Sequence, residues 1–279
     1  MLLVDIGNTR IKWALWQSGR IGPLHAAAHA GWSRENFERR VFGGGRSRSS
    51  GRGQAARVTR APGRMQVTRI IVASVAGAGA DRRFAAAARG AAGVRPEFIA
   101  TSRRAAGVTT RYREPWRLGV DRFVAAIGAH RLAGARGACV VNAGTTVTID
   151  LVDGGGVHYG GAILPGPELM VSSLMRSTAG IERRARETAA PGRGRRSSRG
   201  ASLFARSTKA AIWAGAHLAA AAAVDRAFAE ARGKLGARPL LLLTGGAAGA
   251  LGPLIRSRCV RVADLVLRGV AVYGGLELR

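Results

Sequence analysis

Two short stretches of the sequence combine a carboxylate or amide, a glycine and a hydroxyl at the same spacing. They are "DIGNT" at residues 5–9 and "NAGTT" at residues 142–146, and both have the form [Asp/Asn]-x-Gly-x-Thr. Glycine in such a turn lets backbone N–H groups approach an anion, and a hydroxyl or amide side chain adds a donor. The repeated pattern therefore predicts a site for phosphate oxygens. The alternative is a pair of ordinary hairpins whose turn residues supply positive φ.

Further signals strengthen the phosphate interpretation. Asp5 can hold Mg²⁺ through water, and the metal would then bridge to phosphates. A third glycine-rich strand end, "LTGG", follows at residues 243–246. Walker-type P-loops and Gly-x-Gly-x-x-Gly fingerprints, the competing phosphate motifs, are absent from the sequence. We therefore expect the two turns, at residues 5–9 and 142–146, to bind one nucleotide together.

The elements that must position these turns alternate between strands and helices. Apolar periodicity predicts strand–turn–strand units at 1–24 and 139–152, strands at 67–75 and 95–100, and helices at 33–42, 81–92, 118–134 and 209–231. The last part of the chain reads as strand, helix, strand, helix. This alternation predicts an α/β protein with two lobes, residues 1–117 and residues 118–279, each containing one turn.

Composition narrows the function classes. The net charge is +28, but 41 of the 44 basic residues are arginine, which indicates a compositional drift rather than one selected nucleic-acid-binding patch. No stretch reaches the ~18 apolar residues of a membrane helix, and the N-terminus turns polar at Asp5. Cys139 and Cys259 read as buried, reduced thiols in a cytoplasmic protein. The basic stretches at 43–64 and 183–200 are predicted to be surface inserts.

Five motifs in order carry a family resemblance. They are "DIGNTRIK", "LGVDR", "NAGTTVTID", "GGAILPG" and the Ser-Thr pair at residues 207–208. The ordered set resembles the type III pantothenate kinases, members of the acetate and sugar kinase, heat-shock chaperone and actin superfamily. The resemblance implies a homodimer of subunits with two ribonuclease-H-like (actin-like ATPase) lobes and a nucleotide cleft between them. It also implies the first step of coenzyme A biosynthesis, in which ATP phosphorylates pantothenate to 4′-phosphopantothenate.

The resemblance assigns roles on the substrate side. Asp121 matches the family's general base, although a helix-capping aspartate is the alternative. Arg122 is expected to pair with the carboxylate of pantothenate. By the same resemblance, the residues that contact pantothenate are Tyr112, Gly119, Val120, Asp121, Arg122 and, from the neighbouring subunit, Thr208.

On the nucleotide side, the resemblance places ATP and Mg²⁺ on the two turns. The residues expected there are Asp5, Gly7, Asn8, Thr9, Arg10, Lys12 and Thr145. Lys12 can offer a point charge to phosphate, unless it is a solvated lysine at a sheet edge. Many relatives bind a monovalent cation through an aspartate where this chain has Asn142, whose amide carries no charge, so a requirement for K⁺ or NH₄⁺ is not expected.

Two rival functions remain open at this stage. One is a regulatory or nucleic-acid-binding accessory factor that keeps the nucleotide fold without kinase activity. An RNA-binding signature and interleaved aromatic residues are missing, and aromatics make up only 5% of the chain. The other is a sugar kinase of the same superfamily, whose cysteine-rich zinc-binding variety is excluded by the two isolated cysteines.

Overall fold

The computed structural model describes residues 1–43, 67–177 and 203–278. They form two compact units that are both discontinuous in sequence. Unit 1 comprises Met1–Gly107, Tyr112–Arg131 and Asp264–Arg279, whereas unit 2 comprises Val108–Arg111 and Leu132–Ala263. We expected two lobes that each consist of one continuous segment, with the boundary between residues 117 and 118. The compact units instead combine segments that are not consecutive in the sequence. Nearly all of the basic stretches at 43–64 and 183–200 lies outside the described residues.

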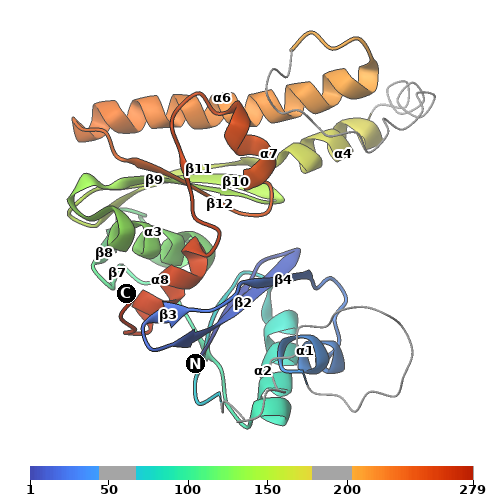
Figure 1. Ribbon diagram of the computed structural model, residues 1–279, viewed down its shortest axis with the longest axis vertical. Helices are drawn as coiled ribbons and strands as arrows, with labels where there is room; N and C mark the ends of the chain where they lie inside the picture. Colours follow the sequence, from blue (N-terminus) through green and yellow to red (C-terminus); the bar gives the residue numbers. More distant parts are fainter. Residues whose placement is uncertain (44–66, 178–202, 279) are drawn as a thin grey trace. The chain divides into compact units, whose positions relative to one another are not determined.

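Unit 1 is built on a twisted sheet (Figure 1). Its central strand, β1, is buried along its whole length. The strand order is β3-β2-β1-β5-β6, and β4 also pairs with β2. β1 runs antiparallel to β2 and parallel to β5. The strands of this sheet are β1 (Leu2–Ile6), β2 (Arg10–Gln17), β3 (Arg20–Ile21), β4 (His25–Ala28), β5 (Ile70–Ser74) and β6 (Glu97–Phe98). The short strand β7 (Arg104–Ala105) belongs to the second sheet.

α8 packs against β1, β2 and β5, while α1 and α2 pack against each other and share the hydrophobic core of this sheet. The described helices that lie wholly or mainly in unit 1 are α1 (Arg34–Val41), α2 (Ala78–Ala92), η1 (Pro115–Arg117), α3 (Val120–Ala133) and α8 (Leu265–Tyr273). Ser33 caps α1 as expected, because its Oγ accepts a hydrogen bond from the Asn36 N–H at 3.3 Å. Phe37 of α1 meets Phe84 of α2 edge-on, with ring centroids 5.7 Å apart, inside the core.

α3 is more deeply buried than its sequence pattern predicts. We expected one apolar face, but Ala125, Ala126 and Ala129 are buried as well. On the face that contains Val124, the helix closely approaches α8, since a Cβ on Gly128 would lie 2.9 Å from the backbone nitrogen of Gly269. Glycine at these positions lets the two backbones come almost into contact.

Unit 2 repeats the strand connectivity of unit 1. Its sheet runs β13-β12-β9-β10-β11-β8-β7, in which β11, β10 and β9 are antiparallel and β9, β12 and β13 are parallel. In unit 1, the order β3-β2-β1-β5-β6 has the same antiparallel-then-parallel pattern. The strands are β8 (Val108–Thr110), β9 (Ala138–Ala143), β10 (Thr146–Val152), β11 (Val157–Pro165), β12 (Leu240–Thr244) and β13 (Val260–Arg261). The duplicated turns thus lie in corresponding hairpins, β1–β2 and β9–β10.

One long helix packs against the sheet of unit 2. This helix, α6 (Thr208–Leu235), buries Ala220, Val224 and Phe228 along one face. The other helices that the structure describes in unit 2 are η2 (Gly134–Arg136), α4 (Pro167–Ser177), α7 (Ala248–Leu251) and η3 (Gly252–Leu254). Within the described parts of the chain, no helix combines the length and the apolar character needed to cross a membrane.

Both cysteines are free thiols, but only one of them is buried. Cys139 lies inside the core of unit 2, where burial raises the pKa of its thiol to about 12. Cys259 is half-buried, so the expectation of two buried thiols is wrong for this residue. It stands just before the short strand β13, whose two residues are exposed.

Candidate active site

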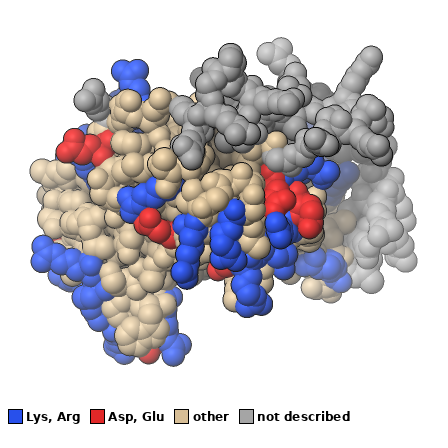
Figure 2. All heavy atoms as spheres, turned by 90° about the horizontal axis from the view of Figure 1, so that it is seen from below, with Lys and Arg blue, Asp and Glu red and all other residues tan. Residues whose placement is uncertain are grey.

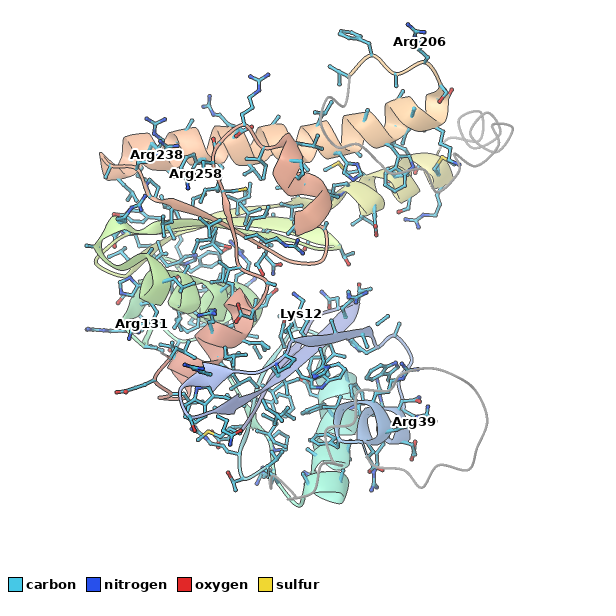
Figure 3. The ribbon with its side chains drawn as sticks, viewed as in Figure 1. Lys12, Arg39, Arg131, Arg206, Arg238 and Arg258 are labelled. Carbon is cyan, nitrogen blue, oxygen red and sulfur yellow. The ribbon has the colours of Figure 1, made fainter. Side chains whose placement is uncertain are left out.

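The predicted nucleotide residues Asp5 and Lys12 lie side by side in unit 1. They are direct partners in the β1–β2 ladder, so their side chains share one face of the sheet. The Lys12 Nζ lies 3.9 Å from the Asp5 Oδ2, and the two side chains are only 16% and 9% exposed. Lys12, labelled in Figure 3, is therefore not a solvated lysine at a sheet edge.

Asp5 is also close enough to Asp121 for the two carboxylates to interact. Burial raises the pKa of Asp5 to about 6, the Lys12 charge lowers it, and the negative charge of Asp121 raises it. Both aspartates belong to unit 1. The fold thus brings together two carboxylates that the sequence assigned to different roles.

Asp121 lies in the first turn of α3, as expected for a residue at a helix start. The carbonyl of Gly119 accepts hydrogen bonds from the N–H groups of Arg122 and Phe123, so Gly119 stands at the position that precedes the helix. Asp121 is inside the helix, and its carboxylate accepts a hydrogen bond from the Arg122 N–H at 2.9 Å. Asp121 is therefore not the N-cap residue itself, although its carboxylate accepts from an N–H of the first turn.

Gly119 allows the Asp121 carboxylate to fold back over the helix start. A Cβ added at Gly119 would lie 2.7 Å from the Oδ1 of Asp121, closer than real contacts allow. The preceding residue, Leu118, is held by its carbonyl, which accepts a hydrogen bond from the Thr101 hydroxyl at 2.9 Å. A larger residue at position 119 would therefore displace the Asp121 carboxylate from this conformation.

Buried Arg122 and half-buried Tyr112 form a polar pair in unit 1. The guanidinium Nη1 of Arg122 donates a hydrogen bond to the Tyr112 hydroxyl at 2.8 Å, and Arg122 is 5% exposed. The backbone around Tyr112 is held by Arg103, whose guanidinium donates to the carbonyls of Tyr112 and Arg113 at 2.5 and 3.0 Å. Val120, between the candidate residues, is buried, which leaves little of its side chain for a substrate.

Glycine at position 7 in the first turn allows a close approach to the Arg10 carbonyl and is not needed for a positive φ. Gly7 does not have positive φ, and a Cβ there would lie 3.2 Å from the Arg10 carbonyl oxygen. Its N–H donates to that same carbonyl at 3.0 Å. Positive φ is therefore the wrong explanation for this turn. The Gly7 N–H closes the turn, so the donors for an anion must come from the residues that follow it.

The second turn is built differently, although its sequence pattern is the same. The Gly144 N–H donates to the Thr146 carbonyl at 2.9 Å, so this turn is one residue shorter than the first. Gly144 does not have positive φ either. A Cβ on Gly166 would lie 2.7 Å from the Thr145 carbonyl oxygen, and one on Gly245 would overlap the carbonyl of Ala143. Three glycine-containing strand ends thus meet at one edge of the unit 2 sheet.

Unit 2 holds the remaining predicted site residues. Asn142 lies in β9 opposite Thr148, and Thr145 is exposed in the second turn. Thr208 is the first residue of α6, where the Ser207 hydroxyl caps the helix by accepting from the Ala210 N–H at 3.3 Å. Asn8, Thr9 and Arg10 are exposed in unit 1.

Sequence reasoning missed one residue that contacts the first turn. His29 follows β4, and its Nε2 lies 2.6 Å from the Gly7 carbonyl oxygen. Its backbone N–H donates to the Thr9 carbonyl at 3.2 Å. A lone histidine without ligand spacing gives no signal in the sequence, and only the pairing of β4 with β2 brings His29 to the turn.

The described residues fit a magnesium ion that is shared with a substrate. Among residues 1–43, 67–177 and 203–278, no group of three His, Cys, Asp or Glu side chains could hold a metal alone. Mg²⁺ typically takes one or two carboxylates and completes its shell with water and phosphate oxygens. The Asp5 carboxylate, buried and close to Asp121, is a donor whose charge a cation would stabilise.

Basic side chains do not gather in one stripe on the face shown in Figure 2. Lys and Arg are scattered over the described surface of that face, with Asp and Glu among them. This distribution agrees with the compositional interpretation of the +28 charge. It does not resemble the continuous basic groove that follows a nucleic-acid backbone.

Two solved structures share the fold of this chain. A proposed Baf family transcriptional activator from Campylobacter jejuni has a TM-score of 0.50 and 16% identity, with 99% of each chain covered. A proposed 2-dehydro-3-deoxygalactonokinase from Sinorhizobium meliloti has a TM-score of 0.50 and 14% identity, over 98% of this chain and 97% of that one. At such identities the likeness concerns the fold alone.

The sequence comparisons define the family. The family model for type III pantothenate kinases matches residues 1–230. Type III pantothenate kinases from Halorhodospira halophila and Aromatoleum aromaticum are 36% and 37% identical, covering 100% and 98% of this chain and 99% and 96% of their own. The chain belongs to the type III pantothenate kinase family. Its function is that of the family, the ATP-dependent phosphorylation of pantothenate for coenzyme A biosynthesis.

Proposed function

We propose that Asp121 accepts the proton of the primary hydroxyl of pantothenate as this hydroxyl attacks the γ-phosphate of ATP, which gives 4′-phosphopantothenate. The observation that carries the proposal is the electrostatic interaction of Asp121 with Asp5. It means that the proposed base and the proposed nucleotide-binding carboxylate lie close together in unit 1. A carboxylate in the first turn of a helix stays ionised and is a weak base. Phosphoryl transfer tolerates a weak base, since its loose transition state chiefly needs alignment and charge neutralisation.

The nucleotide side is assigned to the first turn and to Lys12. Asn8, Thr9 and Arg10 are exposed at the turn and are the proposed contacts of phosphate oxygens, whereas the Gly7 N–H closes the turn. Lys12 would hold one phosphate oxygen as a point charge, and Asp5 would hold Mg²⁺ through water. When bound, this ion would neutralise charge that develops on the β- and γ-phosphates. Thr145 in the second turn is the proposed donor from unit 2.

The pantothenate side is assigned to Arg122 and Tyr112. Arg122 donates to the Tyr112 hydroxyl, so the guanidinium is held in one orientation before any ligand arrives. A planar guanidinium matches a carboxylate better than an ammonium group does. We infer that the pair recognises the carboxylate of pantothenate, while Gly119 keeps space for Asp121 beside it. Val120 is expected to contribute through its backbone, because its side chain is buried.

A homodimer is the proposed assembly, with Thr208 contacting pantothenate in the neighbouring subunit. Supporting it, large apolar side chains are exposed on or just before the packed helices α4 and α6: Leu174, Leu203 and Phe204, which is 87% exposed. Exposed apolar side chains of this size are typical of contact surfaces. The two free cysteines agree with a cytoplasmic location, where thiols stay reduced.

Mass spectrometry of the reaction product tests the substrate assignment. Purified protein incubated with ATP, Mg²⁺ and pantothenate should yield 4′-phosphopantothenate, and omission of Mg²⁺ should abolish the product. Pantothenate that lacks the primary hydroxyl serves as a control for the acceptor atom and should bind without being phosphorylated. ATP hydrolysis without phosphopantothenate would contradict the proposal. So would an absence of turnover together with salt-sensitive binding to random DNA, which the accessory-factor alternative predicts.

A further inference from the structure

His29 occupies a position that no role assigned above explains. It is 6% exposed, and its imidazole Nε2 and its backbone N–H both contact the first turn. We propose that His29 is a positioning residue, which fixes the orientation of the Gly7–Asn8 peptide so that its N–H can meet a phosphate oxygen of ATP. This inference rests on the proposed role of the turn in nucleotide binding.

The hydrogen bond to Gly7 determines which ring nitrogen carries the proton. The Nε2 of His29 lies 2.6 Å from the Gly7 carbonyl oxygen. A carbonyl oxygen can only accept, so Nε2 must be the donor. The neutral imidazole is therefore in the Nε2–H form. This assignment can be checked without any substrate.

The geometry of the peptide unit converts this bond into a constraint on the turn. In a trans peptide, the carbonyl and the N–H point to opposite sides of the chain. Because His29 holds the Gly7 carbonyl on its own side, the Asn8 N–H must point to the other side. The His29 backbone N–H holds the Thr9 carbonyl in the same way, at 3.2 Å. A rotation of the Gly7–Asn8 peptide would break the bond to His29.

The imidazole is itself held by the core of unit 1. Its ring centroid lies 6.4 Å from that of Trp32 and 6.3 Å from that of Phe37, and Phe37 packs against Phe84 of α2. The His29 carbonyl also accepts a hydrogen bond from the Trp32 N–H at 3.0 Å. A rigid aromatic cluster thus supports a turn whose other residues are exposed. This support explains how a polar turn could be ordered before ATP binds.

Two substitutions separate the donor from the packing. His29→Gln keeps an N–H donor with about the reach of Nε2, whereas His29→Leu keeps apolar bulk and removes the donor. Loss of one such hydrogen bond is expected to weaken ATP binding roughly three- to tenfold, measured by calorimetry with the full-length protein. The affinity for pantothenate should stay within twofold of wild type. His29→Gln should recover most of the ATP affinity.

His25 provides a matched control in the same unit. It lies on β4, four residues before His29, and its ring stacks on Trp13 with centroids 5.5 Å apart. His25→Leu therefore removes an imidazole from an aromatic neighbour without touching the turn. We expect it to leave the affinity for ATP unchanged.

The outcomes distinguish this inference from the proposed function. Nitrogen-15 NMR of the free protein near pH 8 should show His29 with its proton on Nε2. A proton on Nδ1, or ATP affinity unchanged in His29→Leu while wild type binds ATP, would overturn the inference and leave the function intact. Equal losses of ATP and pantothenate affinity in His29→Leu would also overturn it, because they indicate general destabilisation. Wild-type protein that fails to bind ATP would overturn the role of the turn itself.

Discussion

The Asp5 carboxylate and the Lys12 ammonium face each other across the first hairpin, 3.9 Å apart and largely shielded from water. Their attraction does not fully compensate for burial, because the pKa of Asp5 is still raised to about 6. The negative charge of Asp121 adds to this cost. Such a carboxylate is stabilised more by a cation than a solvated carboxylate would be.

Replacement of Asp5 should change how stability depends on pH. Folded Asp5 keeps its proton up to about pH 6, whereas the unfolded chain loses it near 3.8, so wild-type stability falls as the pH rises between these values. The Asp5→Asn variant does not show this fall in stability, because an asparagine side chain does not titrate in this range. Its free energy of unfolding relative to wild type should therefore increase by up to about 3 kcal/mol from pH 4 to pH 7. Urea unfolding of both proteins at these pH values measures it, and a pH-independent difference would contradict the prediction.

Asp121→Asn should preserve the fold and lose phosphoryl transfer. Removal of a general base typically lowers kcat by about 10²- to 10⁴-fold. Binding of ATP and pantothenate, measured by calorimetry, should change much less than kcat. Asp264→Asn is a suitable control, since Asp264 lies in the same unit but pairs with Arg268 beside α8. An Asp121→Asn variant with wild-type kcat would exclude Asp121 as the base.

Tyr112→Phe should weaken binding of pantothenate more than binding of ATP. The change removes the hydroxyl that accepts from Arg122 at 2.8 Å and leaves the ring in place. We expect KM for pantothenate to rise roughly threefold to tenfold, because the guanidinium loses one of its restraints. Steady-state kinetics with each substrate varied in turn would test this. A rise in KM for ATP alone would contradict the assignment of Arg122 and Tyr112 to pantothenate.

Activity should not depend on a monovalent cation. Asn142 offers an amide oxygen where a carboxylate would bind K⁺ or NH₄⁺ more strongly. Wild-type kcat/KM in buffers with and without K⁺ should therefore agree within twofold. Asn142→Asp should introduce a dependence on K⁺. Strict dependence of the wild type on K⁺ would show that the amide is a sufficient ligand.

Gly269→Ala should destabilise unit 1 strongly. A Cβ at Gly269 would overlap the carbonyl of Val124, so α3 and α8 would have to separate. We expect a loss of about 2 kcal/mol or more in the free energy of unfolding. Gly233→Ala is the control, because nothing lies within 4 Å of a Cβ there, and it should stabilise α6 by about 0.5 to 1 kcal/mol. A much smaller loss of stability in Gly269→Ala would contradict the prediction, because it would mean that α3 and α8 can separate at little cost.

Local patterns predicted the hairpins, but not which side chains meet. The apolar runs that became β1, β2, β9 and β10 are short and are bounded by turn residues, so the expected strand–turn–strand units are confirmed. The contact of Lys12 with Asp5 depends on the register of β1 against β2, which the sequence does not specify. The contact of His29 with Gly7 depends on β4 pairing with β2.

The glycines show a second limit of the sequence. The motif [Asp/Asn]-x-Gly-x-Thr indicated equivalent turns, yet the structure closes the first at Arg10 and the second at Thr146, with a difference of one residue. Nor did the periodicity of α3 reveal its close contact with α8, because glycine pairs carry no apolar signal. The expected fold was therefore right in class, whereas the membership of its compact units depended on backbone contacts.

The packing of α8 against β1 and β5 has a consequence for biosynthesis. β1 and β5 leave the ribosome early, but the helix that shields them, Leu265–Tyr273, is translated only after the whole of unit 2. Until then, the apolar sheet surface that α8 covers must stay exposed or be screened by a chaperone. Translational stalling within unit 2 should thus yield nascent chains that are protease-sensitive at their own N-terminal strands.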